Sequence, residues 1–205
     1  MSTTSRRRKF QRPPGKRSYR KLFVIAVEGE KSEPQYFAIF NDQRLMSQQS
    51  VIRVNCLKGS SDSSPLKVLM RMKAQLRKEK LKSSDEAWLV VDKDQWTDEQ
   101  LTQLYKWKKE SGNYGFALSN PKFEYWLLLH FEDGKNITSS RNCSDRLQRH
   151  LPDYNKGIDA RKITRDKINE AVHRARRRDN PPCADWPHNL GGTTVYKLVE
   201  NILNG

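Results

Sequence analysis

The sequence is poor in cysteine, histidine and long apolar runs, and each shortage excludes a class of protein. Its three cysteines are far apart and form no CxxC pair, which argues against a disulfide framework or a zinc site and for reduced thiols. None of the four histidines stands at ligand spacing from a Cys, Asp or Glu, so a histidine-rich transition-metal site is not expected. No apolar run approaches the roughly 18 residues that span a bilayer, and the first residues lack the apolar segment of a secretory signal. These shortages predict a cytoplasmic protein that is not embedded in a membrane.

Two common catalytic motifs are also missing. The chain has no GxxxxGK[ST] loop and no GxSxG elbow, so neither a P-loop nucleotide site nor a hydrolase triad is supported.

Acidic residues are in the minority: 24 Asp and Glu face 39 Lys and Arg, for a net charge of +15. Residues 1–21 contain nine basic residues and no acid. Clustered charge of one sign favours a polyanionic partner, DNA or RNA, over a basic surface that serves only solubility. The residues predicted to contact nucleic acid are Arg6, Arg7, Arg8, Lys9, Arg12, Lys16, Arg17, Lys31, Lys93, Arg174, Arg176, Arg177 and Arg178.

Apolar runs alternate with helical patterns between residues 21 and 131. Short β-branched runs at about 21–27, 51–57, 86–91 and 114–119 predict buried strands, each followed by an amphipathic segment. This order is typical of an α/β fold with a mostly parallel sheet of about four strands flanked by helices. We expect a flexible basic arm over residues 1–20, an α/β core over 21–133, and a helical extension without strands over 134–205 that packs on the core.

Acidic residues follow two of these predicted strands: Glu28 and Glu30 after the first, Asp92 and Asp94 after the third. The carboxyl ends of parallel strands meet at one edge of the sheet, where chemistry gathers. Three carboxylates there have one common use, the binding of a hard cation such as Mg²⁺. Alternate residues of an extended segment share a face, so Asp92 and Asp94 are expected to point the same way. In a basic chain, this pattern predicts metal-assisted chemistry on a phosphodiester. The alternative is that the two aspartates form a solvated turn and that Glu33, nearby, only complements a helix dipole.

A third group of residues comes after the fourth predicted strand, where Asn120 and Pro121 are expected to start a helix. Glu124 would lie in the first turn of that helix, close to the same sheet edge, and Lys122 could contact a phosphate or stabilise a leaving group. The alternative, that Glu124 only complements the helix dipole, stays open at this point.

Several segments together resemble the RloB-like proteins. These are Val-Glu-Gly-Glu-Lys-Ser-Glu-Pro-Gln-Tyr-Phe at 27–37, Asp-Lys-Asp at 92–94, Ser-Asn-Pro-Lys-Phe-Glu-Tyr-Trp-Leu-Leu-Leu-His-Phe at 119–131 and Thr-Thr-Val-Tyr-Lys-Leu-Val-Glu at 193–200. The similarity covers nearly the whole chain, with the motifs in the family's order. Ser32 stands where the family often has Thr, a departure that changes no chemistry.

The resemblance implies a Toprim-like core, a role in anti-phage defence and an AAA-type ATPase partner. It assigns Glu28, Asp92 and Asp94 to Mg²⁺ (or Mn²⁺), and so favours Glu28 over Glu30. The expected activity is that of a Mg²⁺-dependent nuclease in which Glu28, Asp92, Asp94, Glu124 and Lys122 act in catalysis. The alternative is a non-catalytic subunit that binds nucleic acid or a partner protein, and assembly with further copies of the chain is left open.

Overall fold

The computed structural model describes residues 20–42, 45–46, 52–59, 64–94, 96–154 and 157–205. Most of the predicted basic arm therefore lies outside the described residues.

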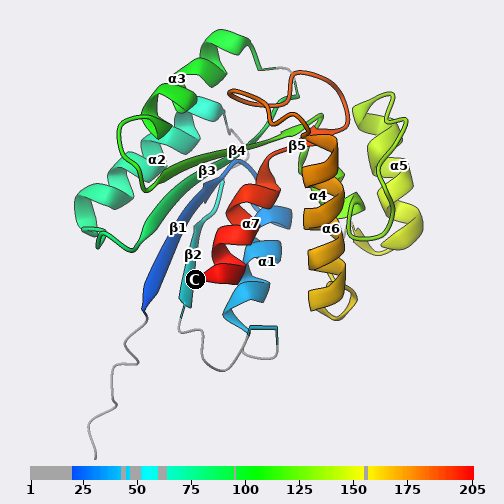
Figure 1. Ribbon diagram of the computed structural model, residues 1–205, viewed down its shortest axis with the longest axis horizontal. Coiled ribbons are helices and arrows are strands. Elements are labelled where there is room, and N and C mark those ends of the chain that lie inside the picture. Colours follow the sequence, from blue (N-terminus) through cyan, green and yellow to red (C-terminus); the bar gives the residue numbers. More distant parts are fainter. Residues whose placement is uncertain (1–19, 43–44, 47–51, 60–63, 95, 155–156) are drawn as a thin grey trace, which may run out of the picture.

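The described chain forms an α/β fold in which helices cover both faces of one sheet (Figure 1). The strands are β1 Lys21–Val27, β2 Ile52–Leu57, β3 Glu86–Asp92, β4 Tyr114–Asn120 and β5 Gly192–Thr193. The helices are α1 Ser32–Ala38, α2 Pro65–Lys78, α3 Asp98–Lys108, α4 Phe123–Leu128, α5 Ser140–His150, α6 Arg165–Arg178 and α7 Val195–Asn204, with short 3₁₀ turns at Ile39–Asn41 and Ala160–Lys162.

The strands lie in the order β2-β1-β3-β4-β5. The first four are parallel, as predicted, and β5 pairs antiparallel with β4. The predicted mostly parallel sheet of about four strands is thus confirmed. The expectation that the last third of the chain contains no strand is wrong, because β5 adds a short fifth strand. β5 consists of one glycine and one threonine, which is too short for hydrophobic alternation to reveal.

Successive residues of each central strand point to opposite faces and enter two separate cores. Leu22, Val24 and Ala26 pack under α2 and α3, while Phe23 and Ile25 pack under the remaining helices. Because every residue from 22 to 27 is buried, β1 reads as a continuous apolar run, as strands covered on both faces do.

The last third of the chain belongs to the same core as the first. Val195, Val199 and Ile202 of α7 are fully buried in the cluster that also holds Phe23 of β1 and Phe37 of α1. Figure 1 shows α7 beside α1 under the sheet, with α6 next to them. Residues 134–205 thus supply a strand and an inner helix to the α/β core.

The helices begin in different ways. Ser64 caps α2 and Thr97 caps α3. The N-cap of α1 is Lys31, which makes no side-chain cap. Asn120 does not cap α4 either: it ends β4, and its amide donates to a neighbouring loop.

No helix in the described ranges has both the length and the apolar character needed to cross a bilayer.

Candidate functional site

The strand order places the candidate site at a topological switch point. The chain runs from β1 outward to β2 and then returns to β3 on the other side of β1. In open parallel sheets, a crevice forms at the carboxyl ends of two such strands and is the usual place for a ligand. Glu28 follows β1 and Asp92 ends β3, so both flank that crevice, and the backbone N–H of Asp92 donates to Glu28 Oε2 over 3.3 Å.

The Glu28 carboxylate is held in place by Trp96. The indole Nε1–H of Trp96 donates to Glu28 Oε1 over 3.0 Å. Burial raises the pKa of Glu28, the hydrogen bonds from Asp92 N and Trp96 lower it in part, and repulsion from Asp94 raises it further. The contact with Trp96 could not be predicted from the sequence, because Trp96 lies in the loop between β3 and α3, where no periodic pattern fixes the direction of a side chain.

The turn between Glu28 and α1 depends on a close approach of two backbones. Gly59, just after β2, donates its N–H to the carbonyl oxygen of Gly29 over 2.9 Å. A Cβ atom on Gly59 would lie 1.7 Å from the carbonyl oxygen of Glu28, so only glycine fits there. The turn after β1 is therefore fixed by a backbone contact with the segment that follows β2.

Asp92 is bound from the β4 side. The backbone N–H of Phe123, at the start of α4, donates to Asp92 Oδ1 over 2.8 Å. Burial raises the pKa of Asp92 well above its usual value, and repulsion from Glu33, Glu124 and Glu28 adds to that shift. Four carboxyl groups from three strand-end segments are therefore close enough to affect one another.

Glu33 is a second site residue that sequence reasoning missed. Its side chain is buried and accepts the N–H of Gly29 at 2.8 Å. Burial, with repulsion from Glu124 and Glu28, raises the pKa of Glu33 to about 7. A role limited to the helix dipole does not account for this burial. The sequence feature that could have revealed Glu33 is its helical spacing from Phe37 and Phe40, because all three side chains lie on the buried face of the segment.

Asp94 lies outside strand β3, which ends at Asp92. Its φ is 27° and its backbone N–H donates to the carbonyl oxygen of Pro121 over 3.0 Å. The argument that Asp92 and Asp94 share a face of an extended segment is therefore wrong, because the backbone turns between them. Asp94 nonetheless stays close enough to Glu28 to raise the pKa of that carboxyl group.

Glu124 and Lys122 lie at the start of α4, beside the residue that binds Asp92. Lys122 is the N-cap of α4 and Glu124 is in its first turn. Tyr154 Oη lies 3.1 Å from Glu124 Oε1 and 2.7 Å from Ser32 Oγ, so one hydroxyl bridges α4 and α1. Glu124 is in the first turn of α4, where it can interact with the helix dipole, as the alternative interpretation has it. It also raises the pKa of Asp92, so it belongs to the acidic cluster.

One cation from the opposite face reaches the same strand end. Arg71 of α2 donates through Nη2 to the carbonyl oxygen of Val27 over 2.6 Å, while its Nε is buried without a hydrogen-bond partner. Burial lowers the pKa of Arg71 and attraction to Glu28 opposes that shift. The acidic cluster therefore has a fixed positive charge at its β1 side.

The donor chemistry of the cluster fits a hard divalent cation, since carboxylate oxygens are the ligands that Mg²⁺ prefers. Among the residues that the structure describes, however, no group of three or more His, Cys, Asp and Glu side chains is arranged to hold a metal ion. One reason is visible in the contacts: both oxygens of Glu28 and one of Asp92 accept hydrogen bonds from the protein. Ligation would require these side chains to exchange those donors for the ion.

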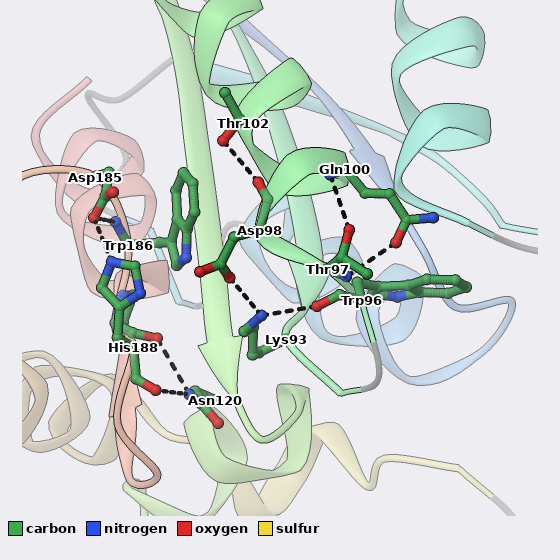
Figure 2. Close-up of polar contacts among 11 residues, drawn as sticks. Lys93, Trp96, Thr97, Asp98, Gln100, Thr102, Asn120, Asp185, Trp186 and His188 are labelled. Atoms are coloured by element: carbon green, nitrogen blue, oxygen red, sulfur yellow. Dashed lines mark hydrogen bonds and ion pairs between the residues drawn. The ribbon is translucent and has the colours of Figure 1, made fainter.

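Several predicted nucleic-acid contacts have partners within the protein. Lys93 Nζ lies 2.8 Å from Asp98 Oδ1 and donates to the carbonyl oxygen of Trp96 over 2.7 Å (Figure 2). On α6, Arg174 pairs with Glu170 and Arg176 with Glu200, whereas Arg178 donates to the carbonyl oxygen of Gly191. Arg177 and Lys31 are exposed. The predicted arm contacts, Arg6, Arg7, Arg8, Lys9, Arg12, Lys16 and Arg17, lie outside the described residues.

Comparison with known proteins gives one family. Neither the curated proteins nor the solved structures contain a match to the chain. The family model described as RloB-like protein matches residues 23–202, a range that includes most of β1, the acidic cluster and most of α7. Since the match covers most of the sequence, the chain belongs to the RloB-like protein family.

Proposed function

We propose that this protein is a Mg²⁺-dependent nuclease of the Toprim type that acts in anti-phage defence together with an AAA-type ATPase partner. The observation that supports it most is the gathering of Glu28, Glu33, Asp92 and Glu124 at the switch point of the sheet, with raised pKa values at the first three. Repulsion among these carboxylates destabilises the ionised form of the cluster, and a bound divalent cation would relieve that repulsion.

Each acidic residue has a role in this proposal. Asp92 and Asp94 would hold the cation, and Glu28 would complete the ligand set or accept a proton from the attacking water. When bound, the cation supplies Lewis-acid polarisation of the phosphoryl group. Glu124, oriented by Tyr154, would support the ligand set from the α4 side.

The basic residues would hold the substrate. Lys122, next to the backbone N–H that binds Asp92, would contact the phosphate at the reacting position. The basic arm and the exposed arginines of α6 would bind backbone phosphates without regard to sequence, which predicts a steep salt dependence of binding.

The test is cleavage of labelled tRNA, single-stranded DNA and duplex DNA in Mg²⁺, Mn²⁺ or EDTA, with and without the partner ATPase. Asp92→Asn keeps an oxygen for the N–H of Phe123 but loses the charge, so cleavage should fall by at least about 100-fold. Asp145→Asn is the matched control, because Asp145 is an exposed acid of α5 outside the cluster. Cleavage that survives in Asp92→Asn would overturn the proposed site.

The second candidate is a subunit that binds nucleic acid or its partner without catalysis. It is favoured by the arrangement of Glu28 and Asp92, whose oxygens are committed to protein donors. Under this alternative no substrate is cleaved in any divalent ion, even beside the ATPase, while oligonucleotide binding is unchanged by Asp92→Asn.

A further inference from the structure

A cleft of about 510 Å³ lies beside β5, outside the acidic cluster. Its lining comes from the end of α6, the loop that follows α6, and β5 itself. Figure 1 shows this loop passing over the carboxyl-terminal edge of the sheet, between α3 and α6. The cleft is therefore built by the last third of the chain, at the same sheet edge as the candidate site.

The strand register fixes the position of the cleft relative to Asp92. Asp92 is paired with Ser119 on β4, and Ser119 with Thr193 on β5, which lines the cleft. Two strand spacings separate Asp92 from Thr193, or about 10 Å. A ligand that extends sideways from the acidic cluster along this edge would reach the cleft next.

The wall of the cleft is fixed by hydrogen bonds. The side-chain amide of Asn120, at the end of β4, donates to the carbonyl oxygens of Pro187 and His188 over 3.2 and 2.9 Å (Figure 2). The N–H of Gly191 donates back to the carbonyl oxygen of Asn120 over 2.9 Å. A cleft held in this way is largely formed before a ligand arrives, as ligand sites usually are.

The charge of the cleft favours an anion. The carboxylate of Asp179 accepts hydrogen bonds from Cys183 N and Tyr196 Oη and lies 3.1 Å from Lys197 Nζ, so its charge is compensated. The Arg178 guanidinium donates through Nε to the carbonyl oxygen of Gly191, and no ion pair engages it among the described residues. Arg178 also contacts the Tyr125 side chain and attracts Asp133, whose carboxylate is already paired with Lys135. Its guanidinium therefore supplies the positive charge of the cleft lining.

The rest of the lining offers backbone and apolar surface. Gly191 has a φ of +78°, and a Cβ atom on Gly192 would lie 2.6 Å from the Pro187 side chain, so two adjacent positions carry no side chain. Leu190, at 47% exposed, is one of two exposed large apolar side chains in the described ranges, and it stands beside these glycines. The cleft therefore combines one guanidinium with an open apolar wall.

We propose that this cleft binds one nucleotide of a single-stranded nucleic acid, flanking the one that lies over the acidic cluster. Its phosphate pairs with Arg178, and its base lies against Leu190 and Pro187. A base can enter a separate cleft only when it is unstacked and unpaired, so the inference specifies a single-stranded substrate region. This inference rests on the proposed function, which brings a nucleic-acid strand to the acidic cluster. It adds the substrate class and a second binding position.

The test measures binding apart from cleavage. The Asp92→Asn protein in EDTA is titrated with a fluorescent single-stranded oligonucleotide and with the duplex of the same sequence. Leu190→Glu replaces an exposed apolar side chain with a carboxylate, which repels the phosphates of the oligonucleotide. This variant should weaken single-strand binding by about tenfold. Arg178→Gln should weaken it similarly and lower the salt slope by about 1. Arg141→Gln removes an exposed arginine of α5 outside the cleft and should leave binding unchanged.

The outcomes separate this inference from the proposed function. Single-strand binding that stays at the parent level in both cleft variants overturns the cleft and leaves the nuclease proposal intact. Equal weakening of single-strand and duplex binding overturns the single-strand specificity. If the parent binds no oligonucleotide, both proposals fail. Circular dichroism and thermal unfolding of each variant check that it is folded, and Arg178→Lys should retain part of the affinity because it keeps the charge.

Discussion

At the scale of single residues, the buried carboxyl group of Glu33 is expected to contribute to the pH dependence of stability, beside Asp92 and Glu28. Its pKa is raised from 4.5 to about 7 in the folded state. A raised carboxyl pKa stabilises the fold at low pH, and that contribution is lost as pH rises from about 4.5 through 7.

Glu33→Gln, which keeps an oxygen for the N–H of Gly29, removes the ionisation. We expect no change in the free energy of unfolding at pH 4, and a gain of up to about 3 kcal/mol at pH 8. Urea titrations of both proteins between pH 4 and 8 check this. A gain that is equal at both ends of the range would contradict the titration of Glu33 as its cause.

Trp96 is the second residue whose role shows only in three dimensions. Trp96→Phe keeps an aromatic ring but removes the N–H that donates to Glu28 Oε1. Losing a hydrogen bond to a carboxylate should raise the Glu28 pKa further. We expect the lower limb of the pH–rate profile for cleavage to shift upward, with the KM for substrate little changed. A uniform fall in rate at every pH would instead indicate a purely structural role.

These two residues show what sequence reasoning can and cannot reach at this scale. Glu28 and Asp92 were accessible because each follows a recognisable apolar run and parallel strands end at one edge. Trp96 was not, because it lies in the loop between β3 and α3, where no periodic pattern fixes the direction of a side chain. Asp94 was placed wrongly because a backbone turn with φ of 27° leaves no trace in a periodic pattern.

At the scale of elements, the acidic cluster depends on a contact between segments distant in sequence. Tyr154 follows α5, and its hydroxyl bridges Ser32 of α1 and Glu124 of α4. The N–H of Ile158 also donates to the side chain of Gln35 in α1 over 2.8 Å. The segment after α5 thus holds the starts of α1 and α4 together through the side chains of Ser32, Gln35 and Glu124.

Tyr154→Phe removes only the bridging oxygen. We expect stability to fall by about 1 kcal/mol, and kcat for cleavage to fall by a larger factor than this loss of fold explains, because Glu124 loses its donor. Ser32→Ala is the comparison: it breaks the α1 half of the bridge and leaves the Glu124 half. If the two variants have equal kcat, Tyr154 acts through packing of α1 alone.

At the scale of the whole molecule, the sequence suggests a boundary near residue 133 and the structure shows a shared core. The helical spacing of Val195, Val199 and Ile202 gives α7 an apolar face, but the spacing alone does not say what that face covers. The face is buried with β1 and α1. β5 joins the sheet through Ser119 and Asn120, and the N–H of Thr194 donates to the carbonyl oxygen of Leu118 over 2.9 Å.

This shared core predicts that the chain unfolds as one cooperative unit. Residues 20–133 expressed alone would expose the apolar surface that α6 and α7 cover, and the carboxyl-terminal edge would lose β5. We expect this fragment to lack a cooperative thermal transition, whereas residues 20–205 should show a single transition whose calorimetric and van't Hoff enthalpies agree.

Val199→Ala in the longer chain should lower the free energy of unfolding by about 2 kcal/mol, because it leaves a cavity in that core, and should shift the whole transition. Two resolved transitions, of which Val199→Ala moves only one, would show that residues 134–205 fold separately. In that case the cleft beside β5 would be able to move relative to the acidic cluster, and the fixed spacing between them would not hold.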